Sequence, residues 1–181
     1  MNKIKACIFD AYGTLFDVNA ACRELSMEVG SNWEKLASLW RLRQVEYTWL
    51  RNSMDEYIDF WQITSDALDY AMETLGIENN ELREQLLNLY LKLEAYPEVK
   101  VLLTKLKQRG LKTGILSNGS MKMLNSAVDN ANIREYLDEI LSVEECEIYK
   151  PSSKVYDLVK IKMQINKENV LFFSSNAWDM H

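Results

Sequence analysis

The chain has 181 residues, of which 48% are hydrophobic and 27% are charged, and it contains only 6 Gly and 2 Pro. These proportions exclude a disordered or collagen-like chain, and at this length roughly 70% of the surface of the unfolded chain can be buried. The net charge of −6, without a cluster of basic residues, argues against a nucleic-acid-binding protein.

The first predicted element is an isolated strand at residues 4–9, which is apolar except for Lys5 and ends at Asp10. Such a run is typical of a buried strand in a parallel sheet. From residue 19 to residue 94 the pattern is helical throughout. We expect one of these helices to end at Gly76 and another to begin after Asn80 as its N-cap, and Pro97 to end the block.

After Pro97, helices and strands alternate. We predict a helix that closes at Gly110, a strand at 112–116, a helix at 121–130, a strand at 139–143, a helix opened by Pro151 and a strand at 170–173. This alternation predicts right-handed crossovers and a parallel sheet. The first strand must then pair with strands far along the chain, so residues 17–97 are predicted to be an insertion into an α/β core.

Ligands of such sheets bind beyond the carboxyl ends of the strands. The residues found there are Asp10, Ser117 to Ser120, Tyr149 to Pro151, Ser174 to Asn176, and Asp179. Together they offer two carboxylates, one ammonium, and hydroxyl and amide groups. This set is suited to catalysis by a nucleophilic carboxylate.

Four segments in this order, FDAYGTLFDV, LSNGS, YKP and SSNAWD, resemble the motifs of the haloacid dehalogenase superfamily, and with LWRLRQVEYTWLR they resemble its L-2-haloacid dehalogenases. The resemblance implies an α/β fold with a Rossmann-like core at 1–16 and 98–181 and an inserted helical cap at 17–97. It also implies hydrolysis of short L-2-haloacids to 2-hydroxy acids, with inversion, through an aspartyl ester. No cofactor and no metal are expected.

The resemblance also assigns roles to individual residues. Asp10 corresponds to the nucleophile. The implied catalytic set is Asp10, Thr14, Arg41, Ser117, Lys150, Tyr156, Ser174, Asn176 and Asp179. The implied substrate-binding set is Tyr12, Arg41, Phe60, Ser117, Asn118 and Trp178.

Asp10 and Tyr12 carry the chemical argument. A carboxylate is a weak nucleophile that becomes effective when it is desolvated and held near its target, although an Asp at this place can also simply cap the following turn. By resemblance, phosphatases of the superfamily carry a second Asp where Tyr12 stands, which protonates the leaving oxygen. A halide needs no proton, and an aromatic ring makes the pocket drier. Ordinary packing of Tyr12 would equally disfavour a phosphatase.

The other polar candidates also have simpler explanations. Arg41 can bind the halide or the substrate carboxylate, or it can lie along a solvated helix face. Lys150 can neutralise the Asp10 site or be a surface lysine. Ser117 and Asn118 can bind the substrate carboxylate or serve only as turn residues. Asp179 can activate water, pair with Lys150, or do both.

Several features concern the cellular setting. The three cysteines, Cys7, Cys22 and Cys146, have no metal-type spacing and fit a reducing compartment. Residues 1–13 lack the long apolar run of a signal peptide, and no segment has the length of a membrane span. We therefore expect a cytoplasmic protein whose partner is a small anionic halogenated carboxylic acid, without nucleic acid or membrane. A homodimer is compatible with the resemblance.

The sequence departs from the family at two places. Leu42 stands beside Arg41 where relatives often have a polar residue, which suggests a different substrate preference. The chain ends at His181, which is assigned no role, before a strand and a helix that the family carries. We therefore expect a C-terminally truncated member with residues 170–173 as an exposed edge strand. The alternatives are another hydrolase of the superfamily, either a phosphatase or an enzyme of a related substitution at a different activated carbon, and an inactive truncated remnant that only binds.

Overall fold

The structure, a computed structural model, describes residues 4–180, so His181 lies outside the described residues. Its four strands form one parallel sheet in the order β3-β2-β1-β4. The strands are β1 (Ala6–Phe9), β2 (Lys112–Ser117), β3 (Glu139–Ser142) and β4 (Val170–Phe173). β1 pairs with both β2 and β4, which confirms the predicted α/β class and the long-range pairing of the first strand.

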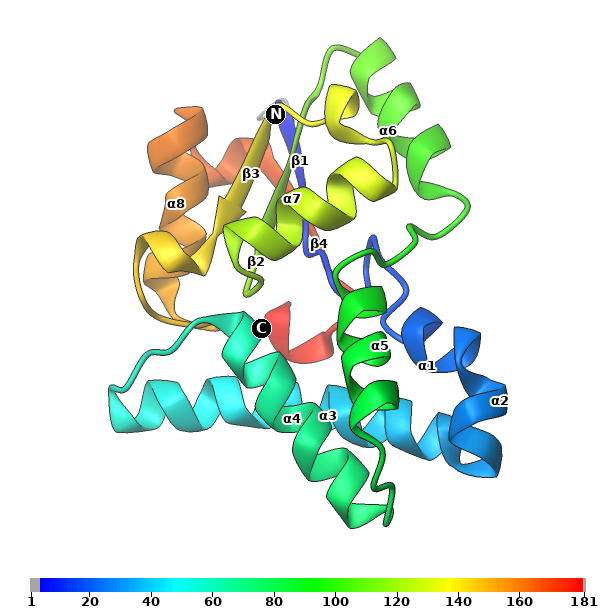
Figure 1. The fold of residues 1–181 in the computed structure, drawn as a ribbon. Helices are drawn as coiled ribbons and strands as arrows, with labels where there is room; N and C mark the ends of the chain where they lie inside the picture. The colour runs from blue at the N-terminus through cyan, green and yellow to red at the C-terminus, as the bar shows by residue number, and fades with distance from the viewer. Residues whose placement is uncertain (1–3, 181) are drawn as a thin grey trace.

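The segment between β1 and β2 is helical. It contains α1 (Ala20–Glu24), α2 (Ser26–Val29), α3 (Trp33–Met54), α4 (Phe60–Thr74), α5 (Asn80–Tyr90) and α6 (Val99–Gln108), with a 3₁₀ helix at Gly30–Asn32. The later helices are α7 (Met121–Asn130), α8 (Ser153–Met163) and four 3₁₀ helices at Arg134–Tyr136, Val143–Glu145, Lys167–Asn169 and Ala177–Asp179. Figure 1 shows α3, α4 and α5 beyond the carboxyl ends of the strands, while α6, α7 and α8 flank the sheet. Among residues 4–180, no helix is long and apolar enough to cross a membrane.

Several predicted element ends are wrong by one or two residues, among them the ends of the second and third strands, which lie at Ser117 rather than at residue 116 and at Ser142 rather than at residue 143. The first strand begins at Ala6 rather than at residue 4. The N-cap of α5 is Asn79 rather than Asn80, because the Asn79 side chain accepts a hydrogen bond from the backbone N–H of Leu82 at 3.0 Å. α8 begins at Ser153 rather than at Pro151, because the backbone of Ser152 is extended (φ −58°, ψ 133°).

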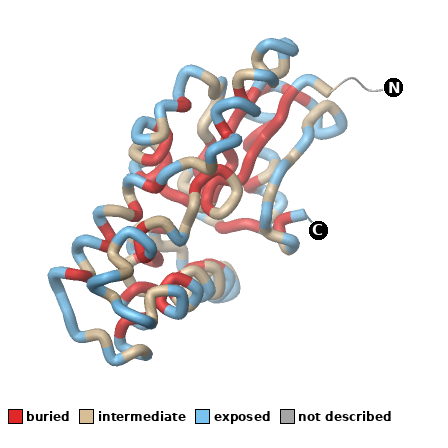
Figure 2. Tube along the Cα trace, turned by 90° about the vertical axis from the view of Figure 1, so that its right-hand side faces the viewer, coloured by how far each residue is buried: buried red, intermediate tan, exposed pale blue. Residues whose placement is uncertain are grey.

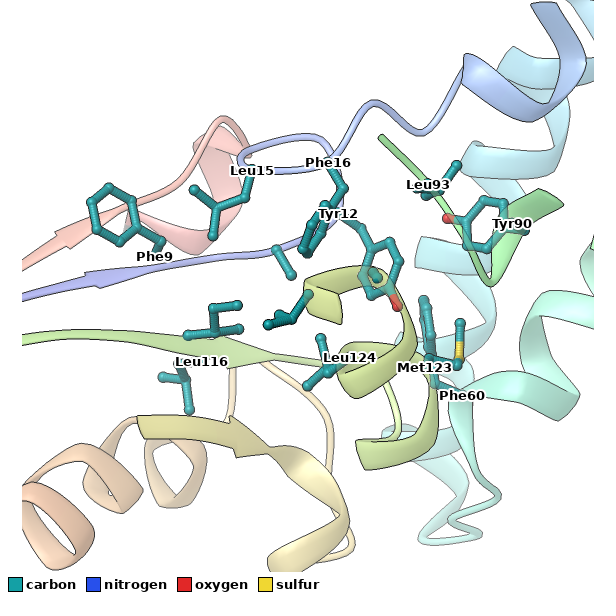
Figure 3. Close-up of a cluster of buried hydrophobic side chains, with 14 of the residues drawn as sticks. Phe9, Tyr12, Leu15, Phe16, Phe60, Tyr90, Leu93, Leu116, Met123 and Leu124 are labelled. Carbon is teal, nitrogen blue, oxygen red and sulfur yellow. The ribbon is translucent and has the colours of Figure 1, made fainter. Parts of the chain in front are cut away.

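One hydrophobic core runs from the sheet into the helical segment. β1 is buried along its whole length, and buried residues continue along most of β2 and on the inner sides of the helices, whereas β4 has none (Figure 2). Tyr12 joins the two regions, since its ring lies 5.7 Å from that of Tyr90 and 5.9 Å from that of Phe60, between centroids (Figure 3). Tyr12, two residues after Asp10, is thereby packed against the start of α4 and the end of α5.

β4 forms one edge of the described sheet, where it pairs only with β1. Leu171 and Phe173 are 45% and 40% exposed on it. Phe173 nevertheless stacks on Phe9 of β1 with ring centroids 4.9 Å apart. The backbone N–H of Asp10 donates to the carbonyl of Phe173 at 2.9 Å, so the β1–β4 ladder continues up to the first residue of the candidate site.

Candidate active site

Asp10 follows directly after β1 and is only 6% exposed. Its Oδ1 accepts a hydrogen bond from Lys150 Nζ at 3.0 Å, and its Oδ2 accepts from Thr14 Oγ1 at 3.2 Å and from Asn176 Nδ2 at 3.0 Å. All three donors are side chains, so among the described residues Asp10 does not cap its own turn. A carboxylate has roughly four lone-pair positions, which leaves one open on Oδ1 for an electrophile.

Lys150 is fully buried, which excludes a surface lysine. Its Nζ lies between two carboxylates, 3.0 Å from Asp10 Oδ1 and 2.9 Å from Asp179 Oδ2. A buried charge is stable only when it is paired and hydrogen-bonded, and these contacts satisfy that need. Two carboxylates and one ammonium leave this cluster with one net negative charge.

Three of the predicted catalytic residues orient the charged groups. The hydroxyl of Tyr156 donates to Asp179 Oδ1. Burial, followed by this hydrogen bond, raises the pKa of Tyr156, so that it remains a donor at neutral pH. Ser174 Oγ accepts from the backbone N–H of Asn176 at 3.1 Å, and Thr14 Oγ1 accepts from that of Ser175 at 2.9 Å.

A small pocket opens next to Asp10. It is lined by Asp10, Tyr12, Arg41, Val45, Thr48, Phe60, Ser117, Asn118, Asn176 and Trp178. All six predicted substrate-binding residues belong to this lining, and Val45 and Thr48 were not predicted for the site. With a cavity volume of about 20 Å³, the pocket has room for about one water molecule and is far smaller than the roughly 300–1,000 Å³ of pockets for drug-sized ligands, so its lining must move apart to admit an organic acid.

Arg41 reaches the pocket from α3, and its Nη2 donates to the backbone carbonyl of Tyr12 at 2.8 Å. It makes no ion pair with any residue between 4 and 180. Its other N–H groups can therefore bind an anion that enters the pocket. Leu42 is 51% exposed and outside the lining, because successive helical residues are rotated by about 100°. The suggested effect of Leu42 on substrate preference has no contact to support it.

The last residue of β2, Ser117, and the first residue of the turn after it, Asn118, contribute two further groups. Ser117 Oγ accepts from the backbone N–H of Gly119 at 3.1 Å, and Asn118 Oδ1 accepts from that of Lys150 at 3.0 Å. Within residues 4–180, the Nδ2 of Asn118 has no partner. Both residues line the pocket, and both carry donor groups, a hydroxyl and an amide.

Gly119 is required in this turn because the Tyr12 ring lies against it. An added Cβ would be 2.6 Å from Tyr12 Cε2. We expect Gly119→Ala to lower the free energy of unfolding by about 1–3 kcal/mol, as overpacked cores do. Urea denaturation should show a smaller loss when the same change is made in a Tyr12→Ala background. An equal loss in both backgrounds would contradict the steric explanation.

Tyr12 itself is a neutral wall of the pocket. Burial raises the pKa of its hydroxyl, and that hydroxyl has no hydrogen-bond partner among residues 4–180. It cannot supply the proton that a carboxylic acid at this position would supply at neutral pH. In the described part of the chain, no group of three or more His, Cys, Asp or Glu side chains could hold a metal ion.

Comparisons with known proteins agree with this geometry. The model of the haloacid dehalogenase-like hydrolase family matches residues 4–181. The (S)-2-haloacid dehalogenase 1 of Pseudomonas sp. (strain CBS-3) is 46% identical in a match that covers 99% of this chain and 80% of the relative. A crystal structure of a dehalogenase superposes with a TM-score of 0.97 at 42% identity, covering 99% of this chain and 80% of the other. The L-2-haloacid dehalogenase from Xanthobacter autotrophicus with chloropropionic acid covalently bound superposes with a TM-score of 0.90 at 38% identity, covering 97% and 71%.

Proposed function

The chain belongs to the haloacid dehalogenase-like hydrolase family, and we propose that it hydrolyses short L-2-haloacids to 2-hydroxy acids with inversion at the halogen-bearing carbon. The observation that carries this proposal is the buried carboxylate of Asp10, which three side-chain donors hold at the floor of a small pocket that also contains Arg41. The named activities of the relatives support the same reaction.

In the first step, an oxygen of Asp10 attacks the halogen-bearing carbon from the side opposite the halogen. The carbon–halogen bond breaks, the halide leaves with the bonding electrons, and the carbon is inverted. The fixed carboxylate contributes because it is already desolvated and oriented. The guanidinium of Arg41 stabilises the negative charge on the halide or the substrate carboxylate, and Ser117 and Asn118 are the proposed donors to that carboxylate.

In the second step, water attacks the carboxyl carbon of the Asp10 ester. Asp179 accepts a proton from this water, and Lys150 and Asn176 stabilise the oxyanion that forms. The bond between this carbon and the bridging oxygen, which Asp10 supplied in the first step, then breaks, and the 2-hydroxy acid leaves with that oxygen after the proton returns to it. Asp10 keeps the oxygen of the water. The covalently bound chloropropionic acid of the Xanthobacter autotrophicus enzyme supports a covalent route.

The test of the proposed function is halide release. We expect the purified chain to release chloride from L-2-chloropropionate, to leave the D-isomer unchanged, and to form one 2-hydroxy acid of inverted configuration. Release of phosphate from phosphate esters without halide release would favour a phosphatase. A folded chain with neither activity and no affinity for a 2-haloacid would favour a binding remnant.

We predict that turnover does not depend on a divalent metal. The ammonium of Lys150 lies between Asp10 and Asp179, where a bridging cation would otherwise offset their charges, and Tyr12 replaces the second Asp of the phosphatases. The rate of chloride release should therefore be the same before and after dialysis against EDTA. Loss of turnover that Mg²⁺ restores would contradict this prediction.

The remaining proposals concern organisation. Residues 17–97 act as a cap over the core formed by 1–16 and 98–181, a division that is supported by the position of α3, α4 and α5 beyond the strand ends (Figure 1). The protein works in the cytoplasm, as its three free cysteines suggest. A homodimer is its proposed assembly, which the mass in solution tests.

A further inference from the structure

Among the described residues, the α3 helix forms hydrogen bonds with the core at two points on one face. Arg41 and Asn52 are eleven residues apart, which is about three turns of an α-helix, so their side chains leave the helix in nearly the same direction. Arg41 donates to the backbone carbonyl of Tyr12. Asn52 contacts the backbone of Tyr149, 97 residues away in the sequence. Between these two contacts, Val45 and Thr48 of the same helix line the pocket.

Asn52 uses both ends of its amide on one residue. Its Oδ1 accepts from the backbone N–H of Tyr149 at 2.8 Å, and its Nδ2 donates to the carbonyl of Tyr149 at 2.8 Å. The Tyr149 side chain is fully buried, and its hydroxyl donates to the carbonyl of Ile58. Its ring lies 5.2 Å from the ring of Tyr57, between centroids. Tyr149 is therefore fixed against the segment around the end of α3 and the start of α4.

The residue after Tyr149 is Lys150, whose backbone N–H donates to Asn118 Oδ1 at 3.0 Å. Asn52 and Asn118 thus hold two successive residues of this loop from different parts of the molecule. The Lys150 ammonium needs this precision, because it must reach Asp10 and Asp179 together at about hydrogen-bond distance.

We propose that Asn52 is a positioning residue for the dehalogenation reaction. It sets the place of the Lys150 ammonium between the two carboxylates, and it ties this placement to the helix that carries Arg41. The inference rests on the proposed function. Removal of the Asn52 amide leaves two backbone groups of Tyr149 without their partners, and the loop must shift or admit water to satisfy them.

The experiment compares three variants with the parent chain. Asn52→Ala removes both hydrogen bonds. Asn52→Asp keeps the size of the side chain and the acceptor for the Tyr149 N–H but loses the donor. Asn79→Ala is the matched control, since it also removes one side-chain hydrogen bond, to Leu82 at the start of α5, without touching the candidate site.

The first readout is independent of activity. Reductive methylation by formaldehyde and a borane reductant, followed by mass spectrometry of peptides, reports how accessible Lys150 is. We expect slow labelling in the parent and in Asn79→Ala, and labelling of Lys150 at least tenfold faster in Asn52→Ala.

The second readout is kcat against KM for L-2-chloropropionate. We expect kcat to fall about 10- to 100-fold in Asn52→Ala and less in Asn52→Asp, because small misplacements near a reacting group cost this much. KM should change by less than a factor of about three, since Lys150 touches the carboxylates and not the substrate.

Labelling of Lys150 at the parent rate in both Asn52 variants overturns the inference, whether or not the parent releases halide. Unchanged kcat in both variants of an active parent also overturns it, because Asn52 would then be only structural. A parent that releases no halide rejects the proposed function, and the labelling result alone then decides whether Asn52 places Lys150. If Asn52→Ala does not fold, Asn52→Asp gives the same two measurements.

Discussion

In a single turnover in water labelled with heavy oxygen, with the enzyme in excess over L-2-chloropropionate, we expect the label to appear in the carboxylate of Asp10 and not in the 2-hydroxy acid. The attacking oxygen of Asp10 becomes the hydroxyl oxygen of the product. The water that hydrolyses the ester delivers its oxygen to the carboxyl carbon, so the enzyme keeps it. The product carries label only in later turnovers, when an already labelled Asp10 attacks again.

The alternative is direct attack by a water molecule that Asp10 or Asp179 activates as a general base. That route sends the label into the first product and leaves every peptide of the enzyme unlabelled. Mass spectrometry of the peptides with Asp10 and with Asp179 separates the two routes and serves as its own control. Label in the Asp179 peptide would show that the wrong carboxylate has been assigned as nucleophile. Asp10→Asn is a weaker test, because the substitution damages both routes.

The arrangement of the strands could be predicted from the sequence because each strand has a local signal. The apolar run at 170–173 matches β4, and the isolated apolar run before Asp10 requires partners far along the chain, which β1 finds in β2 and β4. The exact ends of helices depend on single capping contacts. Positions 79 and 80 are both asparagine, so the sequence does not distinguish them, and only the backbone conformation determines that Asn79 accepts from the N–H of Leu82.

The residues of the candidate site also fall into two groups, those with a local signal in the sequence and those without one. Asp10, Ser117, Asn118 and Asn176 lie at or just after strand ends, so the sheet itself brings them together, and they line one pocket. Arg41 and Tyr156 were indicated by resemblance, since their helices carry no local signal for the site.

Asn52 was missed altogether. A single asparagine near the end of a helix looks like a solvent-exposed residue, and its partner is a backbone 97 residues away, which no periodicity or spacing in the sequence can reveal. Ser175, which donates its backbone N–H to Thr14, was likewise part of a recognised motif without an assigned role. Residues that act through contacts with a distant backbone are therefore the hardest to predict from a sequence, because any residue type can supply the partner.

The electrostatics of the pocket make Arg41 the second residue on which activity depends. Asp10, Asp179 and Lys150 together carry one net negative charge, and the proposed substrate is itself an anion. Without a further cation, the substrate carboxylate would be repelled, and the departing halide would develop its charge beside two carboxylates. The guanidinium of Arg41 is the positive group in the pocket lining that can offset this charge.

We therefore expect Arg41→Ala to lower kcat/KM for L-2-chloropropionate by about 100-fold or more, as the loss of one preorganised charged donor does in other enzymes. The fold should survive, because Arg41 makes no ion pair within the described residues and its hydrogen bonds there go to uncharged groups, the carbonyl of Tyr12 and the hydroxyl of Tyr90, each of which contributes about 1.5–3 kcal/mol at most. The matched control is Arg43→Ala on the same helix. Arg43 pairs with Glu46 and with Tyr70 and does not line the pocket, so its loss should leave kcat/KM within about twofold, as for other ion pairs near the surface. Thermal melts of both variants separate lost catalysis from lost folding.

If Arg41→Ala and Arg43→Ala have the same near-normal kcat/KM, then Arg41 does not bind the halide or the carboxylate, and another group must balance the charge of the site.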